Sequence, residues 1–221
     1  MAKKTVIFDM DGVIVDSEPL HIKHLHAYLV RLGVDDPASF QGNLKGVNAR
    51  DTWTMLIKEF DLEEELDYLI EDARKSYVEY LKKLPELPSI PGAKELIKQL
   101  HKDGYRLALA SSAAPKRIEL FLNKLNLKSY FDTIVSGDDV PKSKPEPDIF
   151  LLAAKKMKAK PGDCVVIEDA KNGVQAAKAA GMKCIAYAGS DHNTDDVSGA
   201  DTIIKDFTAL TRSLQGHQLP V

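Results

Sequence analysis

The sequence predicts an α/β fold, a parallel β-sheet with helices on both faces and a helical domain inserted near the N-terminus. Short apolar runs alternate with helical patterns through most of the 221 residues, an order typical of sheets built from strand–helix units. The runs are apolar throughout rather than at every second residue, as expected for strands that are buried on both faces. One long block without a strand pattern interrupts the alternation.

Six apolar runs are the expected strands, and four helical patterns separate them along the second half of the chain. Strands are expected at 5–8, 107–110, 133–135, 164–167, 183–186 and 202–204. Helices are expected at 93–102, 116–125, 149–157 and 173–180. Because helical connections return the chain to the same end of the sheet, successive strands should run parallel.

The block without strands follows the first strand. It holds three helical patterns, at 21–32, 51–60 and 64–84. The chain returns from it through the segment LPELPSIPG at 84–92, whose three prolines favour an extended, semi-rigid hinge. We therefore expect a core domain of residues 1–15 and 88–221, and a helical domain of residues 16–87.

The composition is that of a globular protein rather than a disordered or nucleic-acid-binding one. Hydrophobic residues make up 44% and charged residues 29% of the chain, the net charge is −3, and there is no long basic run. No apolar stretch is long enough to span a membrane, and Asp9 and Asp11 end the first apolar run, so no signal peptide is expected. Cys164 and Cys184 each lie near a predicted strand and are expected to be reduced and packed, as in a cytoplasmic protein.

Paired carboxylates follow two of the predicted strands. Asp9 and Asp11 come directly after the first strand, where Gly12 can supply a turn because glycine tolerates positive φ. Glu168 and Asp169 follow the fourth strand, and adjacent carboxylates at a strand end are costly unless a cation lies between them and other acids. Each pair also has an ordinary alternative: the first as solvated turn aspartates, the second as a cap for the next helix.

A hydroxyl and a lysine are expected at the same edge of the sheet. Ser111 ends the second strand; it could instead cap the helix near Pro115, although Ser112 is the better capping candidate and would leave Ser111 free. Lys144 lies between residues that precede prolines and are held extended, so it can be aimed at an anion; its alternative is a solvated loop lysine. Open α/β sheets bind ligands at the carboxyl ends of their strands, where all these residues fall.

Together these residue types suit phosphoryl transfer. An aspartate, with an ordinary pKa of about 3.9, is ionised at neutral pH and can attack phosphorus without a base. Phosphate and carboxylates repel one another, so a divalent cation must bridge them, and Mg²⁺ prefers oxygen ligands. A second acid can protonate the leaving oxygen and then activate water, while a hydroxyl and an ammonium hold the other phosphoryl oxygens. The set therefore predicts a magnesium-dependent enzyme with Asp9 as covalent nucleophile.

The segment FDMDGVIVDSE at 8–18 resembles the first motif of the haloacid-dehalogenase-like superfamily. Ser111, Lys144 and the pair Glu168-Asp169 match its second, third and fourth motifs, and the resemblance covers essentially the whole chain. The phrases LKGV at 44–47 and SKPEPDIF at 143–150 most resemble the β-phosphoglucomutase-like and sugar-phosphatase branch. The resemblance implies a Rossmann-like α/β core in which the inserted helical domain serves as a cap.

The resemblance also implies roles for the four acids. Asp9 would be the nucleophile and a Mg²⁺ ligand, and Asp11 the acid/base, with its backbone carbonyl on the metal. Asp169 would be the second carboxylate ligand, and Glu168 would either bind the metal or orient a metal-bound water. An acid at position 11 also separates this chain from true dehalogenases, which have none there.

The phosphate and substrate contacts follow from the same resemblance. Ser111, Ser112 and Lys144 would bind the transferring phosphoryl group. Five residues are candidates for contact with the rest of the substrate: His21, Lys45, Gly46, Arg50 and Lys116. His21 lies in a phrase, DSEPLH, that mutases share with many related phosphatases, and its alternative role is a surface histidine near the hinge.

Two departures bear on the reaction. β-Phosphoglucomutase has an arginine two residues after the Lys-Gly-Val phrase and a lysine three residues after the motif serine, where this chain has Ala49 and Ala114. Both changes remove cations that a bis-phosphorylated intermediate needs, although Arg50 or Lys116 could compensate.

The expected function is therefore a Mg²⁺-dependent phosphatase of a small phosphorylated metabolite, a sugar phosphate above all. A β-phosphoglucomutase-like isomerase is the alternative, and a non-catalytic phosphate-binding module is the third reading. The expected partner is the small phosphorylated substrate, with neither nucleic acid nor membrane, and the chain is expected to be a monomer or a weak dimer.

Overall fold

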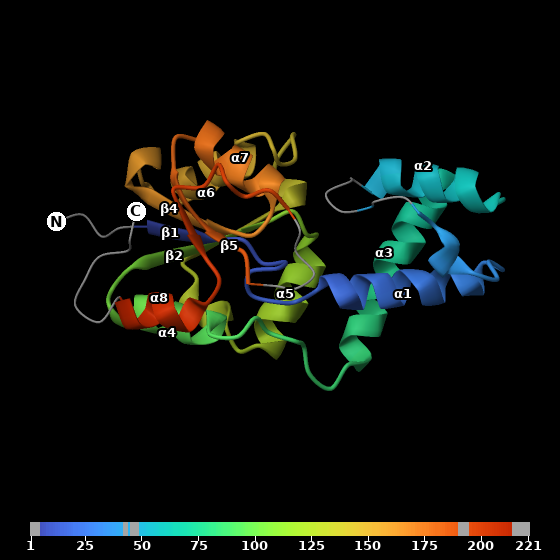
Figure 1. Ribbon diagram of the computed structural model, residues 1–221, viewed down its shortest axis with the longest axis horizontal. Coiled ribbons are helices and arrows are strands. Elements are labelled where there is room, and N and C mark those ends of the chain that lie inside the picture. The colour runs from blue at the N-terminus through green and yellow to red at the C-terminus, as the bar shows by residue number, and fades with distance from the viewer. Residues whose placement is uncertain (1–4, 42–43, 45–48, 190–194, 214–221) are drawn as a thin grey trace. The chain divides into compact units, whose positions relative to one another are not determined.

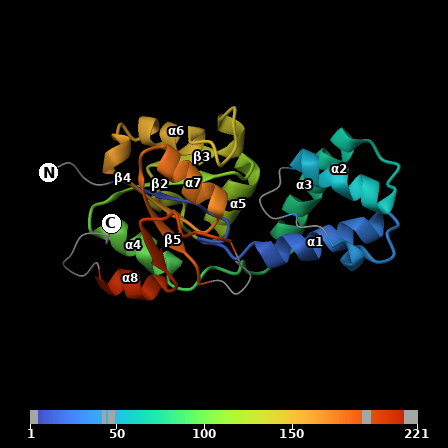
Figure 2. The ribbon, with the colours of Figure 1, turned by 45° about the horizontal axis from the view of Figure 1, so that its top comes forward.

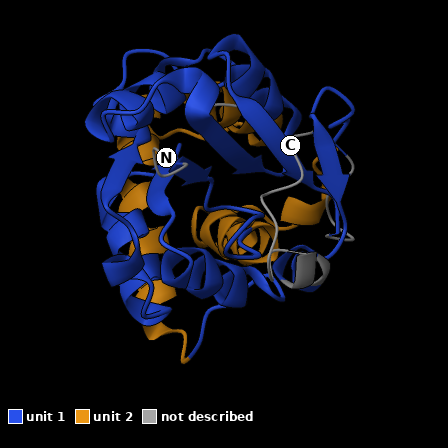
Figure 3. Cartoon of the chain, turned by 90° about the vertical axis from the view of Figure 1, so that its left-hand side faces the viewer, with its two compact units in different colours: residues 1–17, 86–221 blue, residues 18–85 orange. Residues whose placement is uncertain are grey.

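The computed structural model describes residues 5–41, 44, 49–189 and 195–213. The chain forms two compact units, one of Met1–Ser17 with Glu86–Val221 and one of Glu18–Pro85, as coloured in Figure 3. We call them the sheet unit and the helical unit. Their boundaries are close to those expected from the sequence, and the roles of catalytic core and cap remain predictions.

In the described residues of the sheet unit, six parallel strands form one sheet in the order β3-β2-β1-β4-β5-β6. The strands are β1 (Thr5–Phe8), β2 (Arg106–Ser111), β3 (Thr133–Ser136), β4 (Cys164–Glu168), β5 (Lys183–Tyr187) and β6 (Thr202–Ile204). All six occur where the apolar runs predicted them. The order runs outward in one direction from β1 and in the other from β4, so the topological switch point of the sheet lies between these two strands.

Helices cover both faces of this sheet, with α6 and α7 on one side and α4 and α8 on the other (Figures 1 and 2). The helices of the unit are α4 (Ala93–Lys102), α5 (Pro115–Lys124), α6 (Asp148–Lys156), α7 (Lys171–Ala179) and α8 (Phe207–Ser213). Ile7, Ala108 and Val166 pack with Phe150 and Ala177 in the core beneath α6 and α7. In the central strands, neighbouring residues point the other way and are also buried, which explains why these strands are apolar on both faces.

Four of these helices follow the predicted patterns, whereas α8 was not predicted. Its seven residues, FTALTRS, are too few for a clear helical period. The side chain of Phe207 is fully buried, and the place that a Cβ on Gly92 would take lies 3.0 Å from the Phe207 Cβ. Helix α8 is therefore stabilised by packing against the start of α4 rather than by the helical propensity of its own sequence.

The helical unit has a hydrophobic core of its own. Its helices are α1 (Glu18–Arg31), α2 (Ala49–Phe60) and α3 (Leu66–Lys83). The core contains buried Leu29, Leu56 and Leu69 together with Trp53, whose ring meets that of Tyr28 edge-on at 5.5 Å. The Tyr28 hydroxyl in turn donates a 2.7 Å hydrogen bond to Asp72, which ties α1 to α3. No helix in the described ranges has the length and apolar character needed to cross a bilayer.

The two chain segments that join the units run side by side in the sheet unit. Val15 and Ser89 form an antiparallel bridge, the Asp16 N–H donates to the Pro88 carbonyl at 2.9 Å, and the Ile90 N–H donates to the Ile14 carbonyl at 3.0 Å. The proline-rich return segment is therefore extended, as the sequence predicted, and its extended backbone is hydrogen-bonded to the outgoing segment.

Candidate active site

The carboxylates predicted from the sequence meet at the switch point of the sheet. Asp9 follows β1 directly, and its backbone N–H donates a 2.9 Å hydrogen bond to Ile167 of β4. Glu168 is the last residue of β4 and Asp169 the next. Because β1 and β4 are parallel neighbours with Phe8 opposite Ile167, their carboxyl ends bring the two acidic pairs to one edge.

Lys144 lies between two of these acids. Its Nζ is 2.6 Å from Asp9 Oδ1 and 2.7 Å from Glu168 Oε1, and it stands 4.8 Å from the centre of the Phe150 ring. The side chains of Lys144, Asp9 and Glu168 are only 9%, 8% and 2% exposed. Lys144 is therefore not a solvated loop residue but the buried counter-ion of two carboxylates.

The charges at this edge shift one another's protonation. Burial raises the pKa of Asp9 to about 7; the positive charge of Lys144 opposes that rise, and the negative charges of Glu168 and Asp11 add to it. Burial works against the charged form of Lys144, but the carboxylates of Asp9 and Glu168 outweigh it and hold the lysine pKa above its usual value. The ammonium is thus retained at neutral pH, and the site carries more carboxylates than cations.

Both oxygens of Glu168 are engaged by groups of the protein. Oε1 accepts from Lys144, and Oε2 accepts from the backbone N–H groups of Asp169 at 2.6 Å and Ala170 at 2.8 Å. Gly173 of α7 lies against this carboxylate, because a Cβ there would be 1.7 Å from Oε1. Because both of its oxygens are engaged, Glu168 is better placed to hold Lys144 than to bind a metal ion directly.

The loop after β1 carries the remaining acids. Gly12 has a φ of +79°, and a Cβ on it would lie 2.2 Å from Asp169 Oδ2, so the Asp169 carboxylate rests directly against this loop. Asp11 accepts a 2.6 Å hydrogen bond from the Ser17 hydroxyl at Oδ1 and a 2.7 Å hydrogen bond from Arg117 Nη2 at Oδ2. Asp9, Asp11, Glu168 and Asp169 are thus brought together, as predicted.

A magnesium ion fits the chemical type of these donors, which are all oxygens. The oxygen donors at this edge include the carboxylates of Asp9 and Asp169 and the backbone carbonyl of Asp11, whereas both oxygens of Glu168 accept from protein donors. In the described residues, no three His, Cys, Asp or Glu side chains form a ready metal cluster.

The second motif supplies one buried hydroxyl. Ser111 ends β2 and is fully buried. Its Oγ accepts a 3.1 Å hydrogen bond from the Ala113 N–H, which leaves its own O–H to donate.

The prediction that Ser112 caps the next helix is wrong. Pro115 takes the first position of α5, so the N-cap falls on Ala114, which makes no side-chain cap. Ser112 and Lys116 are both exposed.

The substrate candidates of the helical unit are not resolved into one site. Lys45 and Gly46 lie outside the described residues. Arg50 pairs with Asp67 of α3, and both side chains are largely exposed. His21 is exposed on α1 with its ring edge-on to Tyr77, whereas the neighbouring His24 is buried and bonds Ser76 at 3.0 Å. Burial, aided by His21 and Arg31, lowers the pKa of His24 to about 4.

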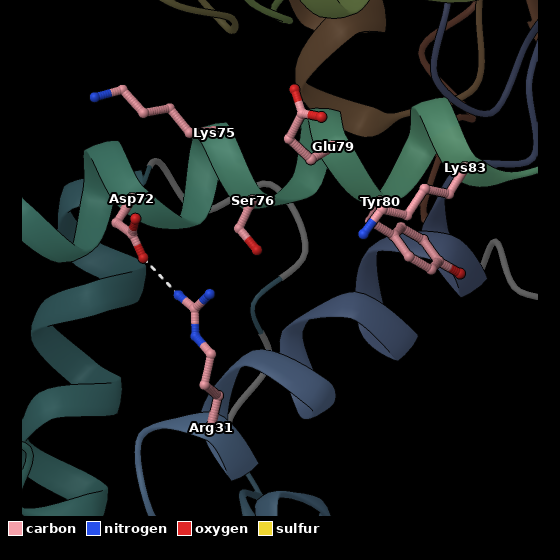
Figure 4. A pocket seen from close by; sticks show the side chains of 7 residues that line it. All are labelled: Arg31, Asp72, Lys75, Ser76, Glu79, Tyr80 and Lys83. Atoms are coloured by element: carbon pink, nitrogen blue, oxygen red, sulfur yellow. Dashed lines mark hydrogen bonds and ion pairs between the residues drawn. The ribbon is translucent and has the colours of Figure 1, made fainter.

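A pocket of about 420 Å³ lies between α1 and α3 in the helical unit (Figure 4). Each side chain that lines it carries a polar or charged group, and the ion pair of Arg31 with Asp72 crosses it. The lining residues are Arg31, Asp72, Lys75, Ser76, Glu79, Tyr80 and Lys83. None of them belongs to the predicted site.

Sequence reasoning missed two residues that contact Asp11. Ser17 lies within the first motif, six positions after Asp11, and its spacing could have drawn notice. Arg117 is 106 positions away, in a helix with no motif of its own at that residue. Only the three-dimensional structure reveals this contact.

Gly173→Ala is expected to push the Glu168 carboxylate away from Lys144, because the new Cβ would overlap its Oε1. The free energy of unfolding should fall by about 1–3 kcal/mol, despite the better helix propensity of alanine. Gly162→Ala is the control, since a Cβ there meets nothing within 4 Å, and should stay within about 0.5 kcal/mol of wild type. Urea denaturation measures both; equal stabilities for the two variants would contradict the packing of Glu168 on Gly173.

The chain is similar to known proteins over the region that contains these motifs. A family model described as haloacid dehalogenase-like hydrolase matches residues 6–187, a span that includes every site residue of the sheet unit. Among solved structures, CbbY from Rhodobacter sphaeroides in complex with phosphate aligns with a TM-score of 0.82 at 26% identity, covering 94% of this chain and 96% of that one. The predicted parallel α/β core with an inserted helical unit is thereby confirmed.

Curated relatives include phosphatases and a mutase. The phosphorylated carbohydrates phosphatase of Thermotoga maritima is 32% identical over 186 residues, 82% of this chain and 83% of that protein. β-Phosphoglucomutase of Bacillus subtilis is 30% identical over 218 residues, 96% of this chain and 93% of that protein. The bifunctional riboflavin kinase/FMN phosphatase of Arabidopsis thaliana is 34% identical over 90% of this chain, which spans only 52% of that longer relative.

The phosphatase names among these relatives support the predicted enzyme class, a phosphoric monoester hydrolase. The family model spans most of the chain, from before Asp9 to beyond Asp169. The chain therefore belongs to the haloacid dehalogenase-like hydrolases.

Proposed function

We propose that the chain is a magnesium-dependent phosphatase of small phosphorylated metabolites, a sugar phosphate above all, and that it works through an aspartyl phosphate on Asp9. The observation that carries this proposal is the buried contact of Lys144 with Asp9 and Glu168 at the switch point of the sheet. A cation held beside a carboxylate nucleophile is the arrangement that phosphoryl transfer to an aspartate requires.

Binding of the phosphoryl group is assigned to Lys144 and Ser111. Glu168 holds the lysine from one side, so its ammonium is fixed before substrate arrives. The Ser111 hydroxyl, at the end of the neighbouring strand β2, still has its proton to donate. An ammonium and a hydroxyl together supply charge-assisted hydrogen bonds to phosphoryl oxygens.

The reaction is then a pair of displacements at phosphorus. In the first, an Asp9 oxygen bonds to phosphorus, the bond from phosphorus to the alcohol oxygen breaks, and Asp11 gives its proton to that oxygen. In the second, water attacks phosphorus, Asp11 takes a proton from the water, and the bond to Asp9 breaks to release phosphate. Asp11 thus ends the cycle as it began.

Magnesium is assigned to Asp9, Asp169 and the backbone carbonyl of Asp11. When bound, Mg²⁺ neutralises the repulsion between these carboxylates and the phosphoryl oxygens and so stabilises the charge of the transition state. Glu168 is assigned to Lys144 instead, because both its oxygens are engaged by protein donors.

A sugar-phosphate mutase is the second candidate, favoured by the similarity to β-phosphoglucomutase over 96% of the chain. Two positions weigh against it. Ala49 begins α2 and Ala114 precedes α5, where a mutase has cations. Arg50 pairs with Asp67, so it would have to leave that partner to bind a distal phosphate.

Phosphorus NMR separates the two candidates. With β-glucose 1-phosphate, Mg²⁺ and a trace of glucose 1,6-bisphosphate, we expect the signal of inorganic phosphate to grow. Growth of glucose 6-phosphate without free phosphate would instead establish the mutase, with Arg50 or Lys116 as the compensating cation. A panel of sugar phosphates then ranks the substrates.

Asp9→Asn should lower phosphate release by at least about 10³-fold, because an amide cannot attack phosphorus. The fold should persist, since asparagine has nearly the same shape, and circular dichroism checks this. Phosphate release is followed with a colorimetric assay across the same substrate panel. A purified, folded variant with the wild-type rate would exclude Asp9 as nucleophile.

Removal of divalent cations with EDTA should abolish phosphate release, and excess Mg²⁺ should restore it. The physical reason is that three neighbouring carboxylates would otherwise repel the phosphate. Calcium, which is larger and accepts irregular coordination, should restore much less activity. Full turnover in EDTA would rule out the assigned role of the cation.

A further inference from the structure

We propose that Arg117 is the positioning residue of Asp11 and fixes the orientation of the acid/base carboxylate throughout the reaction. This inference rests on the proposed function, because it concerns the step in which Asp11 protonates the leaving oxygen. No motif contains Arg117, and nothing in the local sequence sets it apart from the other cations of α5.

The carboxylate of Asp11 is held at both oxygens. Arg117 Nη2 donates to Oδ2 at 2.7 Å, and the Ser17 hydroxyl donates to Oδ1 at 2.6 Å. The two donors come from separate parts of the chain, one from α5 and one from the segment that leaves the sheet unit. The side chains of Arg117 and Asp11 are 23% and 31% exposed, so the pair is partly shielded from water but not sealed from it.

Such anchoring matters because the terminal torsion of an aspartate is broad and by itself does not set the plane of the carboxylate. General-acid catalysis requires the proton to lie on the line toward the leaving oxygen, and a displacement of about 1 Å can cost about 100-fold in rate. A contact to Oδ2 from a second element of the fold removes most of this freedom.

Arginine is the suitable residue for this contact. Its guanidinium is never deprotonated in proteins, so it donates to Oδ2 both when Asp11 carries its proton and when it does not. Because Oδ2 must always accept, the transferable proton of Asp11 is left to Oδ1. The same orientation therefore serves proton donation in the first displacement and proton removal in the second.

The position of Arg117 is unfavourable for the helix that carries it. It is the third residue of α5, whose first turn has no acidic residue and also contains Lys116. Positive side chains near a helix N-terminus are destabilising because the helix dipole is positive there. Arg117 therefore does not stabilise α5 through the helix dipole. Its hydrogen bond to Asp11 offsets the unfavourable interaction with the dipole.

The test compares two substrates that differ in their need for an acid. The sugar of a hexose phosphate would leave as an unstable alkoxide and so needs a proton, whereas p-nitrophenyl phosphate releases p-nitrophenolate, a stable anion. The quantity to compare is kcat/KM, because it reports the steps up to the phosphorylation of Asp9. The later attack of water on the aspartyl phosphate does not affect it. The hexose phosphate is the one that the wild-type enzyme hydrolyses fastest.

Arg117→Gln should lower kcat/KM for the hexose phosphate by about 10- to 100-fold and for p-nitrophenyl phosphate by less than about threefold. Arg117→Lys should recover part of the loss, because lysine can still donate to Oδ2. Lys124→Gln, which removes a cation seven residues further along α5, should leave both values unchanged. A misfolded fraction would lower both substrates equally, so the ratio between them is protected from that artefact.

A double-mutant cycle completes the test. If Arg117 acts through Asp11, then Arg117→Gln should add little to the loss caused by Asp11→Asn. Equal losses on both substrates, full additivity, or no loss would overturn the positioning role while leaving the proposed phosphatase intact. If the wild-type enzyme with Mg²⁺ released phosphate from neither substrate, the proposed function would fail and this inference with it.

Discussion

The ammonium of Lys144 between Asp9 and Glu168 is the interaction on which the site depends. Buried charges are tolerated only when they are paired and hydrogen-bonded, and here one lysine satisfies two carboxylates from neighbouring strands. Asp9 lies 135 positions before Lys144 in the chain, so the contact exists only where the fold brings these distant segments together. The arrangement of the charged side chains therefore depends on the folded sheet. The sheet in turn must accommodate a buried cluster of charges.

Glycine provides the room that this cluster requires. Gly12 and Gly173 stand where the carboxylates of Asp169 and Glu168 need space, and a single methyl group at either position would overlap an oxygen. The acids and the glycines thus form one packing unit. Gly173 lies five positions after the Glu168 that it accommodates, whereas Gly12 lies 157 positions before Asp169 in the chain.

Much of this fold could be predicted from the sequence because its physical causes are local. β1 and β4 are almost entirely apolar because both of their faces are buried, and the paired acids at their carboxyl ends indicate a cation site without any knowledge of contacts. Features with distant causes could not be predicted. Helix α8 depends on packing near Gly92, and the partner of Asp11 on α5 lies 106 residues away. The capping role of Ser112 failed for a local reason, since Pro115 already fixes where α5 begins.

The paired segments that join the two units have a consequence for how such a chain can change. Val15 and Ser89 are bridged, so the helical unit leaves the sheet unit and returns to it at one point. For the sheet unit, the segment between Val15 and Ser89 is therefore one closed loop. Doubling the length of a flexible loop raises the entropic free energy of closing it by only about 0.6 kcal/mol. The helical unit also has its own core, so it need not borrow apolar surface from the sheet. A chain built in this way can change the length or the sequence of the whole insert while the acids at the edge of the sheet keep their geometry.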